Sequence, residues 1–88
     1  MKSIIVEILG TAFFLYSILV SSNPLTIGCA LAITIFVTSK FANGHFNPAV
    51  TLMLVSIGKH PVSLLIPYLL SQMVGSLIAV NLVNLTTK

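Results

Sequence analysis

Asn47, Pro48 and Ala49 are the residues of this sequence best placed to do chemistry, because they open an apolar segment too short to cross a membrane. Asn is a favoured N-cap, since its side-chain oxygen accepts an orphan backbone N–H, and Pro fits the first helical position. The tripeptide therefore predicts a helix over residues 48–57. At about 1.5 Å per residue, that helix covers roughly half of a hydrocarbon core of about 30 Å. It is predicted to be a re-entrant half-helix.

The start of such a half-helix can handle polar molecules. Its free N–H groups carry a partial positive charge of about half a unit, which repels cations. Asn43, Gly44, His45 and Phe46 precede it and are expected to be extended, with carbonyl oxygens that line a pore. Carbonyl acceptors followed by a hydrogen-bond donor at Asn47 can bind small neutral molecules with hydroxyl groups that pass in single file. The alternative is a plain cap on a buried helix, and the half-length of the segment argues against it.

Composition assigns the chain to the membrane. Of the 88 residues, 57% are hydrophobic and only 6% are charged, and the mean hydropathy is +1.13, which no soluble domain of this size would carry on its surface. The net charge of +3 therefore bears on topology, and no nucleic-acid-binding patch is predicted. The lipid bilayer is the first expected partner.

Three long apolar runs predict three transmembrane helices, over residues 4–21, 25–41 and 62–83. The expected fold class is an all-α membrane protein in which residues 1–88 form one repeat, three spans plus the half-helix. Irregular backbone at membrane depth must be covered by protein or line a water-filled cavity, so self-association or a partner is required.

Lysines indicate the orientation. An odd number of crossings puts the termini on opposite sides of the bilayer. Lys2, Lys40 and Lys59 then share one side and Lys88 lies on the other, which favours a cytoplasmic N-terminus.

Single ionisable residues give further expectations. Glu7 is the only acid, and because a charge inside a span is costly, it marks a functional or supporting site. His45 and His60 offer too few ligands for a metal ion, and Cys29 has no partner for a disulfide. No catalysis, cofactor or metal is predicted.

Residues 44–51, GHFNPAVT, resemble the first Asn-Pro-Ala box of the aquaporin and glycerol facilitator family, the major intrinsic proteins. The similarity covers nearly the whole chain and corresponds to the N-terminal half of such a channel. It implies passive transport of water or small neutral solutes such as glycerol, with no enzymatic activity. Outside the box it is carried by Glu7, Gly10 and Thr11 in the first span and by Tyr68, Gln72 and Gly75 in the third.

Members of the family it resembles consist of two inverted repeats, and this sequence resembles one of these repeats. The resemblance therefore implies a homodimer of oppositely inserted copies, with up to four such pseudo-channels gathered together. The lysine bias favours a single orientation instead, so a cytoplasmic N-terminus and dual topology both stay open. Two rival readings stay open too. One is a parallel oligomer, structural or an unselective pore, and the other is an obligate partner of a separately encoded second half.

The resemblance also assigns site residues. A selectivity constriction falls on Ile27 of one copy, on Ile35 and Gly44 of the inverted copy, and on Val50, which stands where the family's second box is followed by Arg. This aliphatic ring implies a wider, less discriminating pore. The resemblance implies that Glu7 and Gln72 support the loop before the half-helix, and His45 is expected to hold this loop through a hydrogen bond.

Overall fold

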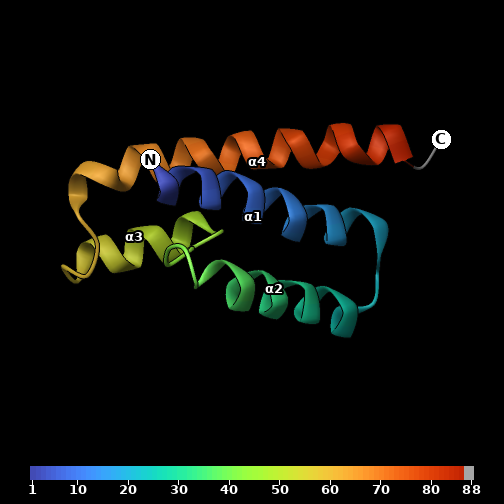
Figure 1. The fold of residues 1–88 in the computed structure, drawn as a ribbon, viewed down its shortest axis with the longest axis horizontal. Coiled ribbons are helices and arrows are strands. Elements are labelled where there is room, and N and C mark those ends of the chain that lie inside the picture. Colours follow the sequence, from blue (N-terminus) through green and yellow to red (C-terminus); the bar gives the residue numbers. More distant parts are fainter. Residues whose placement is uncertain (87–88) are drawn as a thin grey trace.

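The computed structural model describes residues 1–86, and its regular elements are all helical within that range. It measures 42 × 23 × 22 Å along its principal axes. In Figure 1, α1 and α4 run side by side in the same direction and α2 runs back beside α1. The described chain ends lie toward opposite ends of the long axis, and the outer end of α3 extends beyond the start of α1. The elements are α1 (Lys2–Val20), α2 (Pro24–Thr38), α3 (Pro48–Ser56), the short 3-10 helix η1 (Val62–Leu64) and α4 (Leu65–Thr86).

The same local signal starts two of the helices. Asn23 caps α2 by accepting a hydrogen bond from Leu25 N–H at 2.8 Å, and Asn47 caps α3 by accepting one from Ala49 N–H at 2.8 Å. A proline follows each cap and supplies the fixed φ of the first helical turn. After α3 the chain turns at Gly58, whose φ of +78° is a conformation that glycine adopts at low cost.

Figure 1 also shows that α3 begins well inside the long axis and runs toward the end where α1 begins. It has nine residues, Pro48–Ser56, close to the predicted range of 48–57. At about 1.5 Å per residue it is roughly 13 Å long. A half-length helix close to the predicted range therefore forms, and it starts well inside the long axis of the molecule.

The packing between α1 and α4 depends on a glycine. A Cβ on Gly75 would lie 2.8 Å from the backbone oxygen of Ile8 and 2.8 Å from Cβ of Thr11, which is too close for real atoms. Only a residue without a side chain lets the two backbones approach this closely. Gly28 on α2 differs, because a Cβ there would have no neighbour within 4 Å.

The interior is polar and the exterior is apolar. The largest fully buried side chains are Glu7, Thr11 and Thr51, whereas Leu25 and Phe36 are more than two-thirds exposed. A soluble domain would show the reverse distribution. The apolar exterior is what a bilayer requires, because lipid tails solvate such side chains.

Two helices are long and apolar enough to cross a membrane, by length and composition: Lys2–Val20 and Val62–Thr86. The predicted second span, 25–41, is shorter than expected, since α2 ends at Thr38 and has 15 residues. The chain turns there, with N–H groups of Phe41 and Ala42 both bonded to the Thr38 carbonyl. Three crossings therefore remain a prediction.

Candidate functional site

Glu7 holds the loop that leads into α3. Its carboxylate is fully buried and accepts hydrogen bonds from His45 N–H on Oε1 at 2.9 Å and from Phe46 N–H on Oε2 at 2.5 Å. Both donors are main-chain groups that would otherwise be unpaired within the protein. Charge-assisted bonds of this kind are stronger than neutral ones. An acidic side chain of α1 thus fixes two consecutive peptide groups next to the Asn-Pro-Ala box.

Gln72 and Thr51 extend this network. Nε2 of Gln72 donates to Oε2 of Glu7 and to Oγ1 of Thr51, each at 2.9 Å. The Thr51 hydroxyl also lies 2.8 Å from Nδ1 of His45, a hydrogen bond that fixes the orientation of the imidazole. Loop, half-helix, α1 and α4 therefore meet in one buried polar cluster, which we call the loop clamp: Glu7, His45, Thr51 and Gln72.

The loop conformation corrects one expectation. The stretch before Asn47 is not extended throughout, because Phe46 has a φ of +57°, in the left-handed region that bulky residues rarely occupy. The physical reason is that Glu7 binds successive N–H groups, so both must point toward one carboxylate. Phe46 as a whole residue is only 3% exposed, and its packing compensates for the backbone strain.

Asn47 keeps free hydrogen-bonding capacity. Its Oδ1 is used by the cap of α3, while within residues 1–86 its Nδ2 donates to no acceptor. In the same range the carbonyls of Asn43, Gly44, His45 and Phe46 accept no hydrogen bond. Asn47, Pro48 and Ala49 are all exposed in the single chain. These four carbonyl oxygens and the Asn47 amide therefore have no hydrogen-bond partner within the described chain.

Two cavities flank this loop. One, of about 520 Å³, is bordered by Phe46, Asn47 and Pro48 together with Thr11 and Gln72. We call it the box cavity.

The other cavity, of about 550 Å³, is bordered by Asn43, Gly44, His45 and Val50 and opens beside Lys59. We call it the mouth cavity. Residues 43–45 therefore border the mouth cavity, and residues 46–48, which follow directly, border the box cavity.

The predicted constriction residues are not assembled in one chain. Gly44 and Val50 share the mouth cavity, whereas Ile27 and Ile35 lie on α2, about two turns apart. The sequence assigned them to different copies, so a single chain does not bring all four together.

Some site residues escaped the sequence analysis. Thr51 bonds to two other members of the loop clamp, and its position one turn after Asn47 in the same helix was the available signal. His60 and Tyr68 pack their rings against His45, with centroids 4.6 and 4.7 Å from it. Nothing in the sequence spacing brings these three together.

Burial lowers the pKa of the His45 imidazole, an effect that the Glu7 carboxylate opposes and nearby His60 reinforces. The neutral ring is therefore favoured. Among residues 1–86 there is no group of three or more His, Cys, Asp and Glu side chains that could hold a metal ion.

A model of the family described as Major intrinsic protein matches residues 1–88. This chain belongs to the major intrinsic protein family. The resemblance inferred from the Asn-Pro-Ala box is thereby confirmed. Members of this family are integral membrane channels and not enzymes, which confirms the prediction of a protein without catalytic activity.

Curated relatives give the same assignment. Aquaporin-8 of Notomys alexis is 36% identical over 94% of this major intrinsic protein and 36% of its own length. The Glycerol uptake facilitator protein of Streptococcus pneumoniae is 38% identical over 69% of this chain and 26% of its own. The chain spans about a third of the length of the first relatives it matches. No solved structure matches it.

Proposed function

We propose that this protein forms a passive membrane channel for water or small neutral solutes such as glycerol, with Asn47 at the pore centre. One observation carries the proposal: a half-length helix starts at an exposed Asn-Pro cap, and the preceding loop is fixed by a buried carboxylate. Similarity to Aquaporin-8 and to glycerol uptake facilitators supports the solute class.

The groups without hydrogen-bond partners beside α3 favour uncharged hydroxylic solutes. Free carbonyls at Asn43 through Phe46 accept hydrogen bonds, and Nδ2 of Asn47 donates one. A molecule with both donor and acceptor can exchange its water contacts for these. The N-terminus of α3 adds a positive potential that disfavours cations. Neither feature needs energy input, so transport is downhill.

A second copy inserted in the opposite orientation would complete the pore. Thr11 and Gln72 border the box cavity together with the exposed Asn47 and Pro48. Within residues 1–86, Oγ1 of Thr11 and Oε1 of Gln72 are buried without a hydrogen-bond partner. Buried polar atoms of this kind are normally satisfied. In the proposed arrangement each protomer contributes three crossings and one half-helix, and four pseudo-channels can gather.

Pore selectivity would follow from the constriction. The constriction would be an aliphatic ring without Arg. It would consist of Ile27 of one copy and Ile35 and Gly44 of the other, next to Val50. Such a ring presents no strong donor, so glycerol should pass as well as water. Glu7 and Gln72 serve this pore as supports of the loop and not as groups that touch solute.

Stopped-flow light scattering on proteoliposomes under water and glycerol gradients tests the channel. The informative variant is Asn47→Asp, because Asp also caps helices while it removes the donor and adds a negative charge. Asn23→Asp is the matched control, an identical change at the equivalent cap of α2. We expect flux to fall in the first variant only. Shrinkage no faster than in empty vesicles contradicts the proposal.

Assembly is tested separately. With Lys2→Cys in sealed vesicles, labelling from both faces supports inverted copies. Labelling from one face only supports the parallel oligomer. If flux appears only after a separately encoded second half is added, the chain is an obligate partner and not a channel by itself.

A further inference from the structure

The hydrogen bonds of the loop clamp run in one direction, and their donors can be counted. Within residues 1–86 all partners of the Glu7 carboxylate are N–H groups, so its oxygens act only as acceptors. Both N–H bonds of the Gln72 amide are used, one toward Glu7 and one toward Thr51. A rotated amide would set its oxygen against a carboxylate oxygen. Glu7 therefore fixes the amide of Gln72, and Oγ1 of Thr51 accepts from it.

Thr51 has one hydroxyl proton to donate. Its Oγ1 lies 2.8 Å from Nδ1 of His45 but 3.4 Å from the carbonyl of Asn47, which already accepts the main-chain N–H of Thr51 at 3.1 Å. A hydroxyl donor normally lies about 2.5–3.0 Å from an acceptor oxygen, so the longer contact is weak and the proton goes to Nδ1. Because burial lowers the pKa of this imidazole, the ring is neutral and its single proton lies on Nε2.

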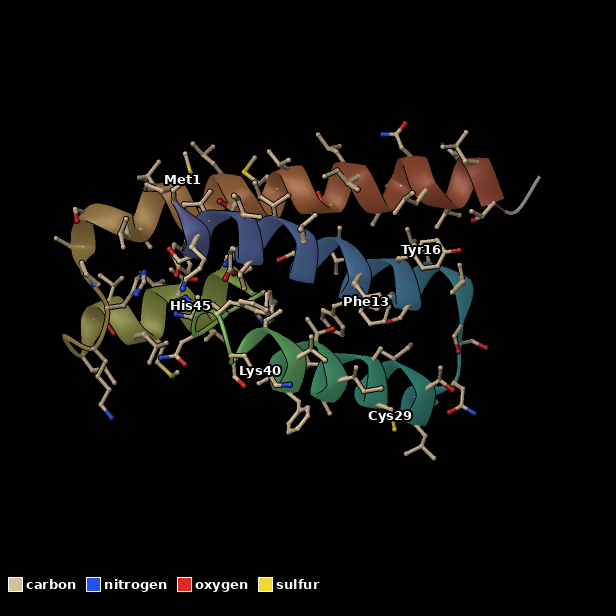
Figure 2. All side chains as sticks on the ribbon, in the orientation of Figure 1. Met1, Phe13, Tyr16, Cys29, Lys40 and His45 are labelled. Atoms are coloured by element: carbon tan, nitrogen blue, oxygen red, sulfur yellow. The ribbon has the colours of Figure 1, made fainter. Side chains whose placement is uncertain are left out.

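Nε2 of His45 faces open space. Figure 2 shows His45 toward the end of the long axis at which α1 begins, and the residue borders the mouth cavity beside Asn43 and Gly44. In residues 1–86 the fully buried side-chain atoms without a hydrogen-bond partner belong to Thr11, His60 and Gln72. Nε2 of His45 also lacks a partner in this range but is not fully buried, so it is open to the cavity that the residue borders.

We propose that Gln72 and Thr51 are positioning residues that hold His45 in its Nε2–H tautomer, so that the ring offers an N–H donor to a hydroxylic molecule in the mouth cavity. Each member of the clamp accepts on one side and donates on the other, and the direction is set by Glu7. The opposite tautomer would place a lone pair beside Asn43 and Gly44, whose carbonyls are also acceptors. The inference deepens the proposed channel function and rests on it for the solute, whereas the tautomer can be measured without transport.

Nitrogen-15 NMR of histidine-labelled protein in detergent measures the tautomer. The chain has two His, so His60→Phe assigns the remaining signals to His45. Above pH of about 8, where an ordinary imidazole is neutral, we expect the His45 proton on Nε2 and a bare, hydrogen-bonded Nδ1. A proton on Nδ1 in the wild-type chain overturns the proposal, and this outcome does not depend on how well any Thr51 variant folds.

Variants of Thr51 test what holds the tautomer. Thr51→Val keeps the shape of the side chain but removes the hydroxyl, so we expect His45 to give signals of both tautomers. Thr51→Ser restores the hydroxyl and should restore the wild-type spectrum. Thr34→Val is the matched control, because Thr34 is also buried and its hydroxyl donates only to the carbonyl of Ala30. A single Nε2–H tautomer in Thr51→Val contradicts the positioning role.

Glycerol flux in proteoliposomes tests the use of the donor. We expect flux to fall about threefold in Thr51→Val, the effect of one weakened hydrogen bond, and to stay near wild type in Thr51→Ser and Thr34→Val. Wild-type flux in Thr51→Val, together with a mixed tautomer, overturns the role of the His45 N–H in permeation. Absent flux in the wild-type chain contradicts the channel instead, and the NMR result still decides the tautomer.

Discussion

The ring of Phe46 occupies the volume that a Cβ on Gly10 would need. Such a Cβ would collide with three carbons of the ring, and a Cβ on Gly44 would collide with the same ring from the loop itself. The two glycines thus form a slot for Phe46. Since Phe46 precedes Asn47 and has a left-handed backbone, the slot sets the direction in which the chain reaches the half-helix.

Gly10→Ala tests this slot. The added methyl must displace the Phe46 ring, so we expect a loss of about 1–3 kcal/mol in the free energy of unfolding. Thermal melting in detergent, followed by circular dichroism, measures the change. Gly28→Ala is the matched control, because a Cβ there meets no atom within 4 Å. Equal melting temperatures for the two variants would refute the slot.

Glu7→Gln should loosen the loop while leaving the helices formed. The amide keeps one acceptor oxygen, but its NH₂ group faces a main-chain N–H that formerly met a carboxylate oxygen. Hydrogen bonds to charged groups contribute about 1.5–3 kcal/mol, so faster amide hydrogen exchange is expected at His45 and Phe46. Ser56→Ala, which removes only a local bond to Met53, serves as control. Unchanged protection at both amides would show that Glu7 does not hold the loop.

Gly58→Ala should destabilise the turn after α3. A non-glycine residue at a φ of +78° costs about 1–2 kcal/mol, and Gly58→Asn should cost less because Asn tolerates left-handed backbone better. Chemical or thermal unfolding of the two variants gives the comparison. If Gly58→Ala is as stable as wild type, the turn can change its backbone conformation without a loss of stability.

Val50→Arg should change selectivity. A guanidinium beside Gly44 narrows the mouth cavity and adds donors, so glycerol flux should fall more than water flux. We expect the glycerol-to-water ratio to decrease severalfold, with Val50→Leu as an uncharged control of larger size. Stopped-flow scattering measures both fluxes in one preparation. An unchanged glycerol-to-water flux ratio would contradict the assignment of Val50 to the constriction.

The start of the half-helix could be predicted because its signal is local: Asn47 and Pro48 act on N–H groups within one turn. The left-handed backbone of Phe46 could not, since it depends on Glu7, 39 residues away in sequence. The contact between the His60 and Tyr68 rings could not be predicted for the same reason, because it needs the turn at Gly58 to bring His60 back toward Tyr68. The sequence predicts the end of α2 three residues too late. Ser39 to Phe41 continue a run that is compatible with a helix, but the chain turns after Thr38.

The opposite placement of the two described chain ends has a consequence for duplication (Figure 1). In the proposed topology of three crossings, if two copies of this chain were joined head to tail by a short soluble linker, the second would begin on the side where the first finishes. It would then be inserted upside down with no additional crossing, whereas a parallel pair would need an extra membrane segment in the linker. A tandem fusion of this chain therefore encodes inversion by itself, and its flux can be compared directly with that of the separate protomers.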